Sequence, residues 1–230
     1  ERADYLRFNV SSRVQENVGV DDLTIPRLSV IQDLSPQRKK NDPEYIEGAE
    51  EGLLFNTVTG ELYGSSILFV PVYFRKEWCI WKLQAAGGGF EGAYETEAEA
   101  MAEFDRQGYA EDTFKKGDER ICAHEIVDMG QHFGIVVHDN GKLEDIVISM
   151  SKSKMKVSRQ FNTIVKMAGG DRFSRIYKIG VVEDENGAGQ KYFNLSVAAK
   201  GYVSESTYRA AERMYEAISS GEKNVERKAD

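Results

Sequence analysis

The chain has no long hydrophobic run. Its longest apolar stretch, residues 67–74, contains Pro71 and is followed at once by Arg75 and Lys76. A membrane-spanning helix needs about 18 or more consecutive apolar residues, so we expect no membrane span and a cytoplasmic location. Residues 67–74 instead predict a β-strand, in which Pro71 marks an edge position or a bulge.

Cysteine and histidine are scarce. The two cysteines, Cys79 and Cys122, lie far apart and neither belongs to a CxxC pair, which favours two reduced thiols over one disulfide. The three histidines offer one close pair with cysteine, Cys122-x-His124, whereas zinc sites usually combine two such clusters. We interpret that pair as part of a half-buried strand, and we expect neither a metal nor another cofactor.

Signatures of the common catalytic classes are also missing. There is no GxSxG sequence, and the glycines at 87–89 are not followed by the Lys-Ser/Thr of a phosphate loop. We therefore predict that the chain is not an enzyme. Glu144-Asp145 precedes a predicted strand that ends near Lys152 and Lys154. Because nucleases combine carboxylates with a lysine around a metal ion, a metal-dependent nuclease stays open as the least favoured alternative.

Positive charge is concentrated in one segment of an acidic chain. Eight basic residues and one acid give residues 151–180 a charge of +7, which leaves −15 for the rest of a chain whose net charge is −8. Such an oriented field indicates a directed, negatively charged partner. The eight cations are Lys152, Lys154, Lys156, Arg159, Lys166, Arg172, Arg175 and Lys178.

Strand and hairpin signals dominate the remainder. Runs of β-branched and aromatic residues bounded by Gly, Asn and Asp predict a hairpin over 52–63, strands over 67–83 with a turn at 75–77, strands over 121–127, 132–138 and 143–150, and a hairpin formed by 175–182 and 191–198. Residues 25–36 fit either a short helix or an extended segment. Because strands do not alternate with helices, the predicted class is α+β, mainly β, as an OB-like antiparallel barrel or curled sheet.

Three helices complete the predicted fold. Thr96 and Glu99 form a capping-box pattern at the start of an acidic helix over 96–107. Residues 151–168 are amphipathic, with Phe161 and Val165 on the apolar face and the lysines opposite. Residues 204–219 form the C-terminal helix. We expect a loosely ordered segment at 1–22, one domain at 23–222 with the helical insertion near 95–111, and a tail at 223–230.

Cations and aromatic rings interleave in two parts of the chain. Single-stranded nucleic acid is held by a cationic groove and by aromatic rings that each contribute about 1–3 kcal/mol of stacking. A basic helix face alone is most often only solvated, but here several such features coincide in an acidic chain. We therefore predict a sequence-tolerant single-stranded DNA-binding protein. The candidate contacts are Tyr73, Arg75, Lys76, Trp78, Trp81, Lys82, Lys152, Lys156, Arg159, Lys166, Arg172, Arg175, Tyr177, Lys178 and Tyr192.

Several short motifs resemble those of a known group of phage proteins. They are Ile25-Pro-Arg-Leu, Gly52-x-x-Phe55-Asn-Thr-x-Thr-Gly60-Glu, Val70-Pro-Val-Tyr-Phe, Ile148-Ser-Met-Ser-x-Ser-Lys-x-Lys-x-Ser-Arg159 and Tyr192-Phe-Asn. The pattern spans residues 23–222 and is similar to bacteriophage single-stranded DNA-binding proteins with an OB-type core. The resemblance implies a non-enzymatic role in phage DNA replication or recombination. Such proteins often end in an acidic tail, and the segment 224–230 is not strongly acidic.

The predicted partners are single-stranded DNA in the host cytoplasm, phage or host replication proteins, and a second copy of the chain in a homodimer. A different class of function also fits the composition. The acidic helix near 95–111 would suit a protein-interaction or host-inhibitor module, because its carboxylates form an exposed charged face.

Overall fold

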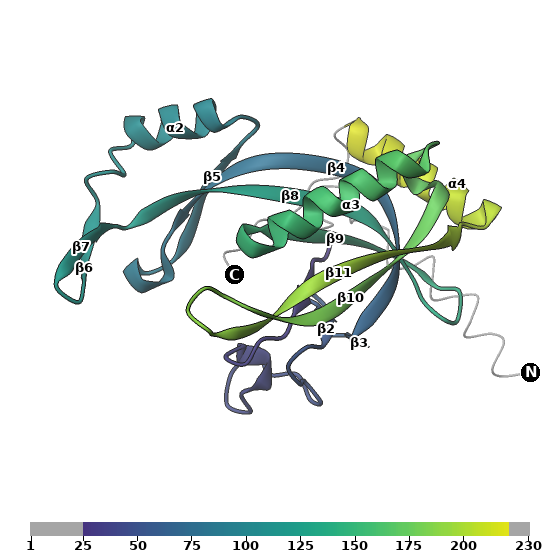
Figure 1. The fold of residues 1–230 in the computed structure, drawn as a ribbon, viewed down its shortest axis with the longest axis horizontal. Coiled ribbons are helices and arrows are strands. Elements are labelled where there is room, and N and C mark those ends of the chain that lie inside the picture. Colours follow the sequence, from purple (N-terminus) through teal and green to yellow (C-terminus); the bar gives the residue numbers. More distant parts are fainter. Residues whose placement is uncertain (1–24, 221–230) are drawn as a thin grey trace, which may run out of the picture.

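The computed structural model describes residues 25–220 (Figure 1), so the predictions for residues 1–22 and 223–230 lie outside the described part. The strands are β1 Leu28–Val30, β2 Leu54–Asn56, β3 Leu62–Gly64, β4 Ser66–Lys82, β5 Gly89–Tyr94, β6 Thr113–Lys116, β7 Glu119–Cys122, β8 His124–Val137, β9 Leu143–Ser151, β10 Arg175–Glu185 and β11 Lys191–Tyr202. The helices are α2 Glu97–Arg106, α3 Met155–Ala168 and α4 Glu205–Ser219. Short 3-10 turns are η2 Pro36–Arg38, η3 Gln84–Ala86, η4 Lys152–Lys154 and η5 Arg172–Ser174.

One antiparallel sheet organises the molecule. Its strand order is β11-β10-β4-β8-β9, with β5 beside the distal half of β4, and the small sheets β1-β2-β3 and β6-β7 accompany it. The predicted α+β, mainly β class with antiparallel pairing is therefore confirmed. Within residues 25–220 the strand pairing does not close into a barrel. The sheet β1-β2-β3 contacts β9 through a bridge between Arg27 and Val147. It contacts β11 through the side-chain amide of Gln32, which forms hydrogen bonds with both backbone groups of Phe193.

The strands β4 and β8 are longer than the sequence pattern predicts. The expected turn at residues 75–77 is wrong, because Arg75 and Glu77 pair with Gln131 and Met129 in an unbroken ladder. The expected break between 127 and 132 is wrong for the same reason, since β8 continues through those residues. The bulge predicted at Pro71 is confirmed, although β4 is a central strand and not an edge strand.

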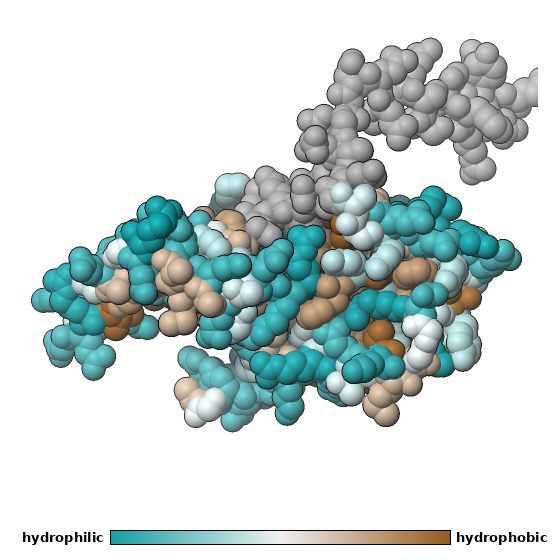
Figure 2. All heavy atoms as spheres, turned by 90° about the horizontal axis from the view of Figure 1, so that it is seen from above, coloured by the Kyte–Doolittle hydropathy of each residue, from teal (hydrophilic) through white to brown (hydrophobic). Residues whose placement is uncertain are grey.

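The distal halves of β4 and β8 leave the body of the molecule as an arm. Figure 1 shows this arm carrying β5, α2 and the β6–β7 hairpin. The predicted capping box starts α2, because Thr96 Oγ1 accepts from the Glu99 N–H and the Glu99 carboxylate accepts from the Thr96 N–H, both at 3.2 Å. Seen from the side of α2, the arm is largely hydrophilic (Figure 2).

The body has a helix on each face of the sheet. On one face, Phe161 and Val165 of α3 pack against Phe69 of β4 and Ile148 of β9. On the other face, α4 packs Ala211, Met214 and Ile218 against Val72 and Phe133. Successive strand residues point to opposite faces, so each strand serves both layers. Burying each large apolar side chain contributes about 1.5–3 kcal/mol to folding.

The predicted basic helix begins four residues later than its periodicity suggests. Residues 152–154 form the turn η4 before α3 begins at Met155. Lys152 has φ +50°, and among the described residues it is the sole non-glycine residue with positive φ. The C-terminal helix is confirmed, with Ser204 as its N-cap. Cys79 and Cys122 form no disulfide, as expected. None of the helices within residues 25–220 is long and apolar enough to cross a membrane.

Candidate nucleic-acid interface

Predicted cations from the arm and from α3 meet at one carboxylate. Lys76 and Trp78 lie two residues apart on β4, so both side chains leave the same face of the strand. The Lys76 ammonium lies 4.6 Å from the centre of the Trp78 ring. It also lies 3.7 Å from Asp128 of β8, and Arg159 of α3 approaches the same Asp128 oxygen at 3.7 Å. The fold thus joins two predicted segments that are far apart in the sequence.

The turn η4 and the first turn of α3 bring two further cations close to the sheet. Lys152 forms an ion pair of 2.6 Å with Glu125 of β8, and Lys156 is exposed one turn further along the helix. Lys156 also influences Asp184 of β10, whose pKa is lowered by hydrogen bonds from Asn194 and neighbours and to a lesser extent by Lys156. The predicted Tyr192 donates its hydroxyl to Asp184 at 3.0 Å. We call Lys76, Trp78, Lys152, Lys156, Arg159 and Tyr192 the cationic junction.

Carboxylates partly neutralise the cationic junction. Asp128, Glu125 and Asp184 each face at least one of its members. Exposed ion pairs of this kind contribute at most about 1 kcal/mol each. A phosphate group can therefore replace such a carboxylate as the partner of a cation at little cost.

The other predicted residues of the arm lie elsewhere. Arg75 and Trp81 alternate with Lys76 and Trp78, so they leave the opposite face of β4. There Arg75 pairs with Glu77 at 3.6 Å, and the Trp81 ring lies 5.0 Å from the Phe90 ring. Two further candidates have protein partners of their own. Lys82 pairs with Asp112 at 3.3 Å, and Tyr73 lies against the rings of Phe133 and Tyr215.

The Arg172 side chain forms its contacts inside the protein. It is half-buried beneath α3, where it donates to Asn162 Oδ1 at 2.7 Å and to His132 Nδ1 at 3.2 Å. Its guanidinium also lies over the rings of Phe74 and Phe161. Burial lowers the pKa of Arg172 to about 10. These contacts give Arg172 a structural role beneath α3, so we do not count it in the cationic junction.

The predicted residues of β10 do not share one surface. Tyr177 is 1% exposed and packs against Phe161, so its ring is not available to a base. Its neighbour Lys178 leaves the opposite face of the strand. Arg175 stacks on Tyr202 at 4.4 Å and donates to its hydroxyl. Lys166 is exposed in the last turn of α3, about 15 Å along the helix from Lys156.

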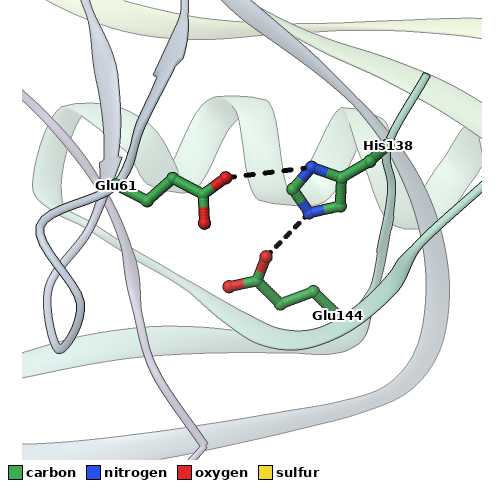
Figure 3. A group of neighbouring side chains, drawn as sticks. All are labelled: Glu61, His138 and Glu144. Atoms are coloured by element: carbon green, nitrogen blue, oxygen red, sulfur yellow. Dashed lines mark hydrogen bonds and ion pairs between the residues drawn. The ribbon is translucent and has the colours of Figure 1, made fainter. Parts of the chain in front are cut away.

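A second polar cluster was not predicted as a site. Glu61, His138 and Glu144 bring one ligand atom each within 4.8 Å of one another, as a metal ion would require. Figure 3 shows the two carboxylates facing opposite nitrogens of the His138 ring. The distances are 2.7 Å from His138 Nε2 to Glu144 and 4.0 Å from Nδ1 to Glu61. In the sequence, the pair Glu144-Asp145 was the one visible signal.

Hydrogen bonds determine the protonation state of the Glu144 carboxylate. Burial alone would raise its pKa, but hydrogen bonds from Tyr63, His138 and Asn56 outweigh burial and lower the pKa. The donor distances are 2.8 Å for Tyr63 and 2.7 Å for Asn56. Burial and the neighbouring carboxylate raise the pKa of the Tyr63 hydroxyl well above its usual value. Glu144 is therefore ionised at neutral pH, and Tyr63 keeps its proton.

A cavity adjoins this second cluster. Its volume is about 510 Å³, and it lies where the start of β4 and the end of β8 meet the β2–β3 hairpin. Its wall includes Glu61 and His138, and it also includes the cations Lys178 and Lys200 and the hydroxyl-bearing Ser66. The cavity thus offers groups of both charges to a polar ligand.

Comparison with known proteins identifies one family. The family model described as Pam3 phage gp34-like protein matches residues 3–224. No curated protein and no solved structure matches the chain.

Proposed function

We propose that this chain, which belongs to the Pam3 phage gp34-like protein family, binds single-stranded nucleic acid at the cationic junction. Family membership makes it a bacteriophage protein, and we infer that its binding serves phage DNA replication or recombination without catalysis. One observation carries the proposal. Lys76 and Arg159, which come from the arm and from α3, converge on Asp128 beside the Trp78 ring.

The chemistry of the cationic junction suits a single strand. Such proteins combine cations that track the phosphates with aromatic faces on which bases stack. Lys156 and Arg159 lie three residues apart on α3, at helical spacing, and Lys152 precedes them in the turn η4. Trp78 and Tyr192 flank that row from the arm and from β11. The proposal does not depend on a closed OB barrel, because an open sheet with a helix across it presents the same groups.

The backbone at Lys152 gives further support. A lysine with φ +50° is held in a conformation that costs about 1 kcal/mol or more. Such outliers gather at functional sites, where the surrounding structure maintains them. Here the strained turn brings the Lys152 ammonium to Glu125, three residues before Asp128 on β8 and on the opposite face of that strand.

The test is a titration of labelled oligo-dT against the full chain across a salt series. We expect the affinity to fall steeply with salt, because cations release counterions from the phosphates. Changing Lys76, Lys156 or Arg159 to alanine should each reduce the salt slope by about 0.7. Trp78→Ala should weaken binding by about 1–3 kcal/mol without changing the slope, because stacking carries no charge.

The control is Arg209→Ala, because Arg209 is exposed on α4, on the opposite layer of the body. It should change neither affinity nor slope. An affinity that ignores salt, or equal losses in the control and the junction variants, would contradict the proposal. The competing proposal, a protein-interaction module that uses α2, predicts instead that charge reversal at Glu97 and Glu99 abolishes partner capture while oligo-dT binding is absent in the wild type.

A further inference from the structure

The cluster of Glu61, His138 and Glu144 has a defined direction of hydrogen bonding. Glu144 Oε1 accepts from Asn56 and Tyr63, and Oε2 lies 2.7 Å from His138 Nε2, so a carboxylate in this position accepts a hydrogen bond from the Nε2 proton of His138. In the neutral ring, Nδ1 then carries the lone pair. Nδ1 faces Glu61 across 4.0 Å, as Figure 3 shows.

Histidines in metal sites form hydrogen bonds in the same direction as His138 does here. A histidine that binds a metal through one ring nitrogen almost always donates its other N–H to a carboxylate or a carbonyl. That second partner fixes the tautomer and the orientation of the ring. Here Glu144 occupies that role, and the donors Asn56 and Tyr63 hold it in place.

We propose that Glu61 and His138 bind a divalent transition-metal ion, with His138 Nδ1 and the Glu61 carboxylate as ligands and Glu144 as the positioning residue. A tetrahedral zinc ion with bonds of about 2.0–2.2 Å places two ligand atoms about 3.3–3.4 Å apart. The observed 4.0 Å needs only a small movement of the Glu61 side chain, which is 43% exposed.

Glu61 and His138 both line the cavity of about 510 Å³, so an ion bound between them would be open to this cavity. Two protein ligands leave positions for water or for an anionic ligand, whereas open zinc sites usually hold the ion with three protein ligands. Lys178 and Lys200 line the same cavity and would favour a phosphate-bearing ligand. This inference is independent of nucleic-acid binding at the cationic junction, because His138 follows the last residue of β8, ten positions after Asp128, or about 33 Å along the strand.

One protein cation competes with the metal. The Lys142 ammonium lies 4.0 Å from Glu61 and 3.8 Å from Glu144, and its side chain is 56% exposed. A bound metal ion must displace this ammonium. Removing the Lys142 charge should therefore tighten metal binding, whereas it would do nothing in a cluster that is only a structural ion pair.

The experiment is calorimetric titration of the full chain with Zn²⁺, and with Mn²⁺ as a second probe, at pH 7.5. We expect one bound ion per chain. Glu61→Gln and His138→Gln should weaken binding at least tenfold, and Glu144→Gln should weaken it by about 10–100-fold, as loss of an orienting partner does. Lys142→Ala should tighten binding severalfold.

The control is Glu183→Gln, an exposed carboxylate that pairs with Lys191 outside this cluster. It should leave the titration unchanged. Circular dichroism checks that each variant is folded, and Glu61→Gln keeps the test decisive if Glu144→Gln does not fold. The proposal is overturned if no ion binds, or if binding survives in Glu61→Gln and His138→Gln.

Discussion

Arg172 and His132 form a buried pair that links three elements. His132 is fully buried on β8, and Arg172 lies on the turn η5. Arg172 can only donate, so His132 Nδ1 accepts from it, and the Nε2 proton is donated to Ser158 Oγ of α3 at 2.8 Å. Both ring nitrogens of His132 therefore have a partner, which a buried polar group requires. These bonds fix α3 to the sheet in a way that apolar packing alone would not.

The pH dependence of this pair can be predicted. Burial and the nearby Arg172 charge lower the pKa of His132 to about 3. Below about pH 6.5 the unfolded chain binds a proton that the native chain excludes, so stability falls as the pH decreases. For His132 alone, the free energy of unfolding should drop by about 2 kcal/mol between about pH 7 and pH 5.

Urea unfolding of the wild type and of His132→Asn at pH 7, 6 and 5 measures this contribution. The variant lacks the titrating ring, so the stability gap between the two proteins should narrow as the pH decreases. Other groups titrate in both proteins, and their effect cancels in the gap. A gap that stays constant with pH would contradict a neutral, buried His132.

At the scale of elements, helices were easier to predict than strand continuity. Thr96 with Glu99 fixes the start of α2 through local hydrogen bonds, so the sequence alone suffices. Residues 75–77 look like a turn because they are charged. In β4 these charges alternate between faces and find partners within the sheet, namely Glu77 for Arg75 and Asp128 for Lys76. The pairing with Asp128 depends on the register with β8, which no local pattern contains.

The bulge in β4 gives a prediction at the same scale. Gly134 of β8 lies opposite Pro71, and a Cβ atom there would meet the Val70 carbonyl oxygen and the Phe69 ring. Backbone atoms cannot move aside as flexible side chains do. Gly134→Ala should therefore destabilise the protein by about 1–3 kcal/mol, as overpacking of a core does.

Gly187 offers the matched control for this substitution. It lies in the β10–β11 turn, its φ is not positive, and a methyl group added there would have no atom within 4 Å. Gly187→Ala should be neutral or stabilise by up to about 1 kcal/mol. Denaturant midpoints of the two variants give the comparison. Equal effects would mean that β8 does not approach β4 as closely as the bulge requires.

At the scale of the whole molecule, the sequence identified components but not their assembly. The members of the cationic junction were all among the predicted contacts, because their charge and aromatic character are visible in the sequence. Arg172 and Tyr177 have the same character, yet the fold places the half-buried Arg172 beneath α3 and buries Tyr177 completely. The cluster of Glu61, His138 and Glu144 comes from three separate segments, so only the meeting of the β2–β3 hairpin with the ends of β8 and β9 reveals it.

The long strand β8 links the cationic junction to this cluster and sets their distance. At about 33 Å along the strand, the two lie well beyond the screening length of about 8 Å at physiological salt. The changes that Arg159→Ala and Glu61→Gln cause in the free energies of oligo-dT and Zn²⁺ binding should therefore add within about 0.3–0.5 kcal/mol in the double variant. Oligo-dT affinity should follow Arg159 alone, and Zn²⁺ affinity should follow Glu61 alone. A departure from additivity would mean that a bound strand reaches the metal cluster, because direct ionic coupling between the two sites is screened at this distance.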